Sequence, residues 1–245
     1  MKRKFFAFSV MAFFAIGILP AQDVDKILDK YFETIGQKKL LKIESLVSTG
    51  TIQQMGMNMP FKFIAKRPGM AYIEADVQGA IMKQGYNGET GWMTMPWTGS
   101  MEPVDITGPE LRGLKEMADM DGKLWKYKEK GHQLELIGKE DMDSIKVFVL
   151  KLTEQDGTIS KMYLDADKYL MLKVKSTAFM QGSEVEVEAI MSNFKDVNGY
   201  IMPYTTQQSF GGTIGMTLNL EEVKHNVDID DSIFSKPVTP AGTEE

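Results

Sequence analysis

Alternation of apolar and polar residues with a period of two is the feature that most constrains the fold of this chain. It runs through residues 61–66, 170–175 and 184–191, where every second side chain is apolar and many of those between are lysine or glutamate. Successive side chains of a strand point to opposite faces of a sheet. Each segment therefore predicts a strand with one covered face and one wet face.

Short turn signals separate the strand-like segments. Asn87-Gly88, Asp156-Gly157 and Asn198-Gly199 supply the positive φ angles that tight hairpins need. No long helical pattern lies between the later strands, which disfavours a parallel sheet with crossover helices. We expect these later strands at residues 145–153, 158–164, 169–178, 184–194, 199–210 and 213–223.

Helical periodicity appears in two places. Residues 24–35 carry apolar side chains at three- and four-residue steps and end at Gly36, and a second helix is expected within residues 108–121. About ten strands in one sheet are too many to stay flat. We predict an α+β, mainly β, fold: a single antiparallel sheet curled into an open or partial barrel, with the N-terminal helix and short helices covering an apolar cavity.

The first 21 residues have the order of a secretory signal peptide. Three basic residues precede an apolar run from Phe5 to Leu19, and small residues follow. The run is shorter than the roughly 20 residues that a spanning helix needs, although a retained anchor is the alternative. We expect a periplasmic protein that is not integral to the membrane, with one domain over residues 22–237 and a disordered tail over 238–245.

Charge and composition exclude several functions. Loss of the three basic leader residues would change the net charge from −6 to −9, which disfavours nucleic-acid binding. Cysteine is absent and only His132 and His225 could act as imidazoles. No nucleophile elbow, phosphate-binding glycine loop or zinc motif occurs. We expect no catalytic residue, no metal and no cofactor.

Methionine and aromatic residues are the candidate ligand contacts. Methionine side chains are flexible and polarizable, so they can repack around apolar ligands of varied shape. The alternatives are ordinary core filling for the methionines and cross-strand pairing for the aromatic residues. The candidate cavity residues are Met55, Met57, Met59, Met70, Tyr72, Met82, Trp92, Met93, Met95 and Trp97.

Several short phrases carry a family resemblance. Lys66-Arg67-Pro68-Gly69 ends one strand and is followed by Tyr86-Asn87-Gly88-Glu89-Thr90-Gly91-Trp92. Together with residues 31–36, 197–203 and 234–237, these phrases resemble LolA-like periplasmic carriers, the outer-membrane lipoprotein-sorting proteins. The sequence departs from the family where Ala71 stands in place of a frequent aromatic residue, which leaves the cargo open.

The resemblance implies a fold and an activity. The family's incomplete barrel shelters the acyl chains of lipoproteins, or another lipid, in an apolar cavity, and passes them between inner- and outer-membrane handover proteins. Its lid arginine matches Arg67, which would hold the cavity closed through hydrogen bonds. We expect a monomer. A surface cation at the end of a strand is the other interpretation of Arg67.

Three functions remain to be separated. A carrier needs an empty cavity of several hundred Å³. A non-catalytic interaction module of the cell envelope would have the same fold with a filled core. A hydrolase acting on an envelope polymer would need two carboxylates within about 10 Å of each other in a cleft.

Overall fold

The computed structural model describes residues 21–180 and 183–238. The expected signal segment, apart from Ala21, and nearly all of the expected tail lie outside these residues. The strands of the described part are antiparallel wherever they pair. They are β1 (Ser45–Gln54), β2 (Met57–Lys66), β3 (Met70–Val77), β4 (Ala80–Tyr86), β5 (Gly91–Met93), β6 (Val104–Ile106), β7 (Gln133–Met142), β8 (Ile145–Thr153), β9 (Ile159–Asp165), β10 (Met171–Met180), β11 (Ser183–Asp196), β12 (Ile201–Phe210) and β13 (Thr213–His225).

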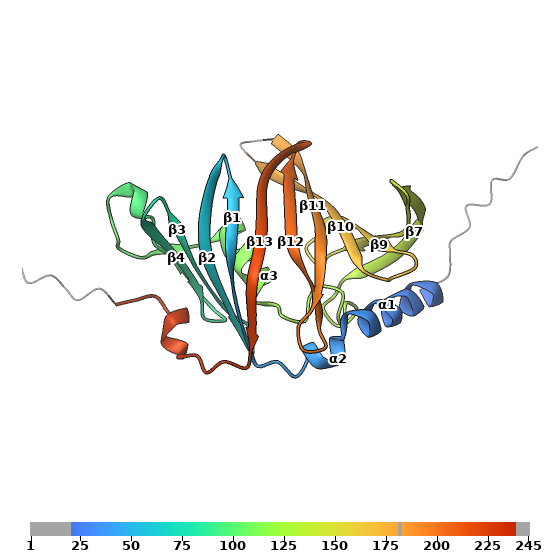
Figure 1. Cartoon of the computed structure of the whole chain (residues 1–245), viewed down its shortest axis with the longest axis horizontal. Coiled ribbons are helices and arrows are strands. Elements are labelled where there is room, and N and C mark those ends of the chain that lie inside the picture. Colours follow the sequence, from blue (N-terminus) through green and yellow to red (C-terminus); the bar gives the residue numbers. More distant parts are fainter. Residues whose placement is uncertain (1–20, 181–182, 239–245) are drawn as a thin grey trace, which may run out of the picture.

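All of these strands form one curled 13-stranded sheet that does not close (Figure 1). The order across the sheet is β6-β5-β4-β3-β2-β1-β13-β12-β11-β10-β9-β8-β7. Two meanders therefore meet where β1 pairs with β13, the first and last strands of the described residues. The predicted open antiparallel sheet is confirmed.

The part of the chain that the structure describes has few helices, and they are short. α1 (Ala21–Ile35) and α2 (Gln37–Leu40) precede the sheet, α3 (Gly108–Ala118) follows β6, and the 3-10 helices η1 (Pro96–Thr98) and η2 (Asp231–Phe234) lie near the ends of the first meander. In Figure 1, α3 lies behind the sheet and α1 lies along its lower right edge. Within the described residues, none of the helices has the length and apolarity to cross a membrane.

Helices α1 and α3 cover the same face of the sheet, here called the inner face. α1 packs Val24, Ile27 and Leu28 against Leu150 and Leu164 among others. Because the apolar side chains of α1 recur at helical spacing, they form one stripe that buries against the strands.

α3 covers the other half of the inner face. Leu114 and Ala118 of this helix are buried against Ala71, Tyr86 and Ile106. Apolar clusters thus fill the two ends of the inner face. The cavities described below lie over the strands between these clusters.

The outer face carries its own small core. Tyr72 and Trp92 alternate with inner-face residues and pack, together with Ile64, against Phe234 of η2. Trp92 Nε1 donates a hydrogen bond to the carbonyl oxygen of Phe234 across 3.0 Å. The C-terminal segment therefore crosses back over the outside of the first meander.

The alternate spacing of Met55, Met57 and Met59, and that of Met93 and Met95, predicts that each set shares one strand face. This prediction is wrong at Met55 and at Met95. Met55 does not continue the pattern of Met57 and Met59, because it lies in the turn between β1 and β2 with φ 50° and is 88% exposed. Met95 likewise follows the end of β5 and precedes η1. A tight turn or a strand end breaks the period of two, so neither methionine shares a strand face as expected.

Candidate functional site

An apolar cavity of 420 Å³ lies on the inner face, between the central strands and the helices. We call it the apolar chamber. Phe61 and Phe63 of β2 and Leu218 and Leu220 of β13 contribute to its floor. Every lining side chain except Ser48 is apolar or aromatic. Such a chamber suits an apolar ligand, because no lining carboxylate or cation would be desolvated by it.

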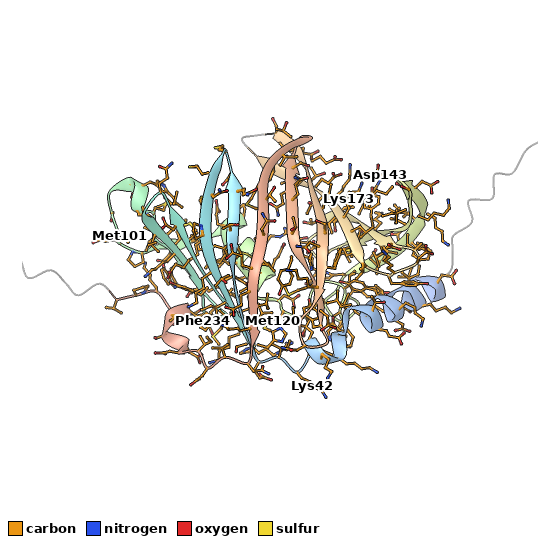
Figure 2. The ribbon with its side chains drawn as sticks, in the orientation of Figure 1. Lys42, Met101, Met120, Asp143, Lys173 and Phe234 are labelled. Atoms are coloured by element: carbon orange, nitrogen blue, oxygen red, sulfur yellow. The ribbon has the colours of Figure 1, made fainter. Side chains whose placement is uncertain are left out.

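The roof of the apolar chamber comes from the helices. Leu40 of α2, Met117 of α3 and Met120 just after α3 line it from this side. Figure 2 shows Met120 near the lower middle of the molecule, between Phe234 on its left and α2 on its right. Methionine is flexible, so the roof can adjust its shape around a guest.

A second cavity of 930 Å³ adjoins the first, and we call it the large chamber. The two share Leu40, Met120 and Tyr200 as lining residues. One side of the large chamber is apolar, with Phe32 and Met162 among its lining residues. Hydroxyl groups and charged side chains line the rest, so the two chambers together offer an apolar end and a polar end.

Arg67, at the end of β2, joins three segments around these chambers. Its Nε donates to the carbonyl oxygen of Ile43 across 2.8 Å, and its Nη2 donates to that of Leu40 across 3.3 Å. Nη2 also lies 2.6 Å from Oδ1 of Asp121 in the segment after α3. The rigid fork of a guanidinium can serve all three acceptors at once.

The segment after α3 has further ties. Gln37 is buried and donates from Nε2 to the carbonyl oxygen of Asp121 across 3.2 Å. Lys130 donates to Oδ2 of Asp119 across 2.6 Å and to the carbonyl oxygen of Gly122 across 2.8 Å. This segment, which carries Met120, is thus held by side chains from α2, β2 and the chain beyond it.

Charged side chains of the large chamber form a closed network. Lys123 Nζ lies 3.0 Å from Oε2 of Glu116 and 2.8 Å from Oε1 of Glu154. Arg112 Nε lies 3.1 Å from Oε1 of Glu116, and its Nη1 pairs with Asp156. Each cation therefore already has at least two carboxylate partners.

Two tyrosines are among the lining residues of the chambers. Tyr200 lines both chambers and Tyr31 of α1 lines the large one. Burial raises the pKa of Tyr200 to about 12. Burial, and then the nearby Tyr200, raise the pKa of Tyr31 well above its usual value. Both phenols are therefore neutral hydroxyl groups under all ordinary conditions.

The expected cavity residues lie elsewhere in the structure. By register, Met57, Met59, Met82 and Met93 are on the inner face, but none of them lines either chamber. Met70, Tyr72 and Trp92 lie with the outer-face cluster instead. Trp97 is 58% exposed in η1. Apolar residues alternate with other residues over 216–220. This pattern could have indicated that β13 contributes to the floor of the apolar chamber.

No protein-family model matches the chain, and no curated protein matches it. Solved structures do. A DUF1329 family protein from Desulfovibrio piger is 14% identical, covers 85% of this chain and 97% of its own, and has a TM-score of 0.59. The chain also matches an outer membrane lipoprotein-sorting protein domain from Vibrio parahaemolyticus at 14% identity, 86% and 95% coverage and TM-score 0.57.

A LolA superfamily protein from Nitrosomonas europaea is 15% identical, covers 86% of this chain and 97% of its own, and has a TM-score of 0.57. The chain has the fold of the LolA superfamily. At these identities the likeness concerns the fold alone. In this LolA-type fold, the two chambers lie between the sheet and the helices, and Arg67 lies beside them.

Proposed function

We propose that this protein is a non-enzymatic carrier that takes the acyl chain of a lipid or lipoprotein into its apolar chamber. The volume of that chamber, 420 Å³, is the observation that supports the proposal. It falls within the range of ligand-binding cavities. Burial of a hydrocarbon chain contributes about 0.8 kcal/mol per CH₂, so part of a long chain suffices for useful affinity.

Arg67 is the proposed latch of the cavity. Its hydrogen bonds to Leu40 and Ile43 and its ion pair with Asp121 tie the roof to the end of β2. Breaking these bonds would free the segment that carries Met120 and open the chamber. Release then needs no catalytic group, only a receptor that offers the chain a competing apolar site.

The proposed setting is the periplasm. The signal-like leader supports export, and one structural neighbour is described as a lipoprotein-sorting domain. We propose that the mature protein works as a soluble monomer that passes its cargo from an inner-membrane donor to an outer-membrane acceptor.

Cavity volume and charge pairing separate the carrier from the alternatives. An interaction module would have filled the space between sheet and helices with side chains. A hydrolase could use Glu116 and Glu154, which share Lys123 in the large chamber. Both carboxylates are already engaged by Lys123 and Arg112, whereas a hydrolase needs carboxylates that are available to its substrate.

Native mass spectrometry of protein expressed in the periplasm tests the carrier. We expect a co-purified lipid or lipoprotein, and displacement of the neutral fluorophore Nile red by acyl lipids. Ile52→Trp should fill the apolar chamber and weaken this binding, since Ile52 lines it. Ile190→Trp is the matched control on the outer face, where Ile190 is 39% exposed. Failure of the wild type to bind any lipid or probe would end the proposal.

A further inference from the structure

The hydroxyl groups of Tyr31 and Tyr200 have no hydrogen-bond partner within residues 21–180 and 183–238. In the same part of the chain, His225 Nε2 is the one fully buried side-chain polar atom that lacks a partner. The two hydroxyl groups therefore keep accessible surface, although their rings are partly buried. Because both residues line chambers, these are polar groups left available to a ligand.

Close backbone packing fixes the positions of the two tyrosines. Gly36 ends α1 with φ 74°, and a Cβ at this position would lie 2.0 Å from the carbonyl oxygen of Gly199. Gly199 directly precedes Tyr200, and Tyr31 lies just over one helical turn before Gly36. The contact that only glycine permits thus holds α1 against the β11–β12 hairpin, and Tyr31 and Tyr200 both line the large chamber beside it.

The charges around the large chamber limit which ligands the two hydroxyl groups can bind. Arg112 and Lys123 are the only cations that line this chamber in the described part of the chain. Both are already paired with Glu116 and Glu154. Among the described residues, none that lines the apolar chamber is charged. A carboxylate placed at the junction would find no free cation, and its desolvation would cost binding energy.

We propose that Tyr31 and Tyr200 form a polar station that donates hydrogen bonds to the carbonyl oxygen of an ester- or amide-linked acyl chain. The apolar tail then lies in the apolar chamber, and the rest of the molecule extends into the large chamber. A carbonyl oxygen has two lone pairs and can accept from both hydroxyl groups. The station selects neutral acyl derivatives against free fatty acids, and this inference rests on the proposed carrier function.

The environment of the tyrosines supports the same selection. Burial raises the pKa of both phenols, which means that negative charge is disfavoured at this place. A fatty-acid carboxylate brings the same kind of charge, whereas an ester or amide brings none. The discrimination therefore acts on the linkage and not on the length of the chain.

The test compares monolaurin with laurate, which have the same acyl chain, at a mildly alkaline pH where laurate is ionised. Displacement of Nile red from the full mature protein gives both affinities. We expect wild-type protein to prefer monolaurin, and the double variant Tyr31→Phe, Tyr200→Phe to lose about tenfold in monolaurin affinity, because two hydrogen bonds are removed. Nile red itself should bind the variant unchanged.

Tyr163→Phe is the matched control. Tyr163 lies on the outer face, where the ammonium group of Lys173 is 4.4 Å from its ring centre. Removal of its hydroxyl should leave both affinities unchanged. Equal affinities of the wild type for monolaurin and laurate would overturn the proposed role of the two tyrosines, and so would an unchanged preference in the double variant. In either case, Nile red binding would still support the carrier function. Absence of Nile red and lipid binding would overturn both.

Discussion

Arg67 Nη2 lies 2.6 Å from Oδ1 of Asp121, and this ion pair joins the end of a sheet strand to the segment that roofs the apolar chamber. The two side chains are 23% and 25% exposed. Partial burial reduces the screening of such a pair by water and salt. The same guanidinium holds the carbonyl oxygens of Leu40 and Ile43, so one side chain ties the roof at three points.

Arg67→Leu should release a bound acyl probe faster. The substitution removes charge-assisted hydrogen bonds from the closed state, and we expect about a tenfold increase in the dissociation rate. The midpoint of thermal unfolding should change little, because Asp121 stays in contact with water. Stopped-flow fluorescence of a labelled acyl chain and a thermal melt measure the two effects.

Two variants accompany this experiment. Arg67→Lys keeps the charge but loses the planar fork, so it should restore only part of the retention. Lys66→Leu removes the neighbouring cation, which donates to the carbonyl oxygen of Ile229 in the C-terminal segment, and should leave release unchanged. A lower melting temperature with unaltered release in Arg67→Leu would make this residue purely structural.

Gly36→Ala should destabilise the fold. The residue has φ 74°, and its new Cβ would meet the carbonyl oxygen of Gly199 at 2.0 Å. Backbone strain and the clash together should lower the free energy of unfolding by about 2–4 kcal/mol. Urea denaturation measures the change through the shift in the midpoint.

Gly113→Ala is the opposite case in α3. A Cβ at Gly113 meets no atom within 4 Å, and the residue is helical. Alanine should stabilise the helix by about 0.5–1 kcal/mol. Equal effects of the two glycine substitutions would contradict the close contact between Gly36 and the β11–β12 hairpin.

The sheet could be predicted from the sequence because its longer strands alternate cleanly. The expected segment 145–153 coincides with β8, and 213–223 falls within β13. β5 and β6 are too short for any period to show. β7 was missed because its register shifts between Leu136 and Gly138, which interrupts the alternation.

The chambers were beyond prediction for another reason. Alternation indicates which residues share a face, but not which face the helices cover. Tyr72 and Trp92 therefore fit the alternation of a strand, but their side chains lie on the outer face of the sheet. The floor of the apolar chamber depends on the pairing of β1 with β13, which brings Ile52 opposite Leu218. No local sequence pattern can indicate that two segments so far apart in the chain pair with each other.

Phe234→Ala should destabilise the protein without changing ligand binding. Phe234 is fully buried against the outer face, and its loss leaves a cavity that costs about 3–5 kcal/mol. Both chambers lie on the inner face, so the affinity for Nile red should be preserved below the melting temperature. Loss of probe binding by the folded variant would show that the two faces are coupled.

His225 should make stability depend on pH in the weakly acidic range. Burial lowers its pKa in the folded state below the ordinary value of 6.5, so the unfolded chain binds the proton more readily. The neutral imidazole therefore contributes fully to the free energy of unfolding above pH 6.5. This contribution is lost as the pH falls from 6.5 toward the pKa of His225 in the folded state.

Comparison of wild type with His225→Gln isolates this contribution. Carboxylates also titrate on acidification, but they are common to both proteins and cancel in the difference between their free energies of unfolding. Urea denaturation across about pH 5–8 should show a difference that shrinks toward the acidic end, because only the wild type carries the group that resists protonation in the folded state. A difference that is constant with pH would mean that His225 takes up its proton equally in the folded and unfolded chains.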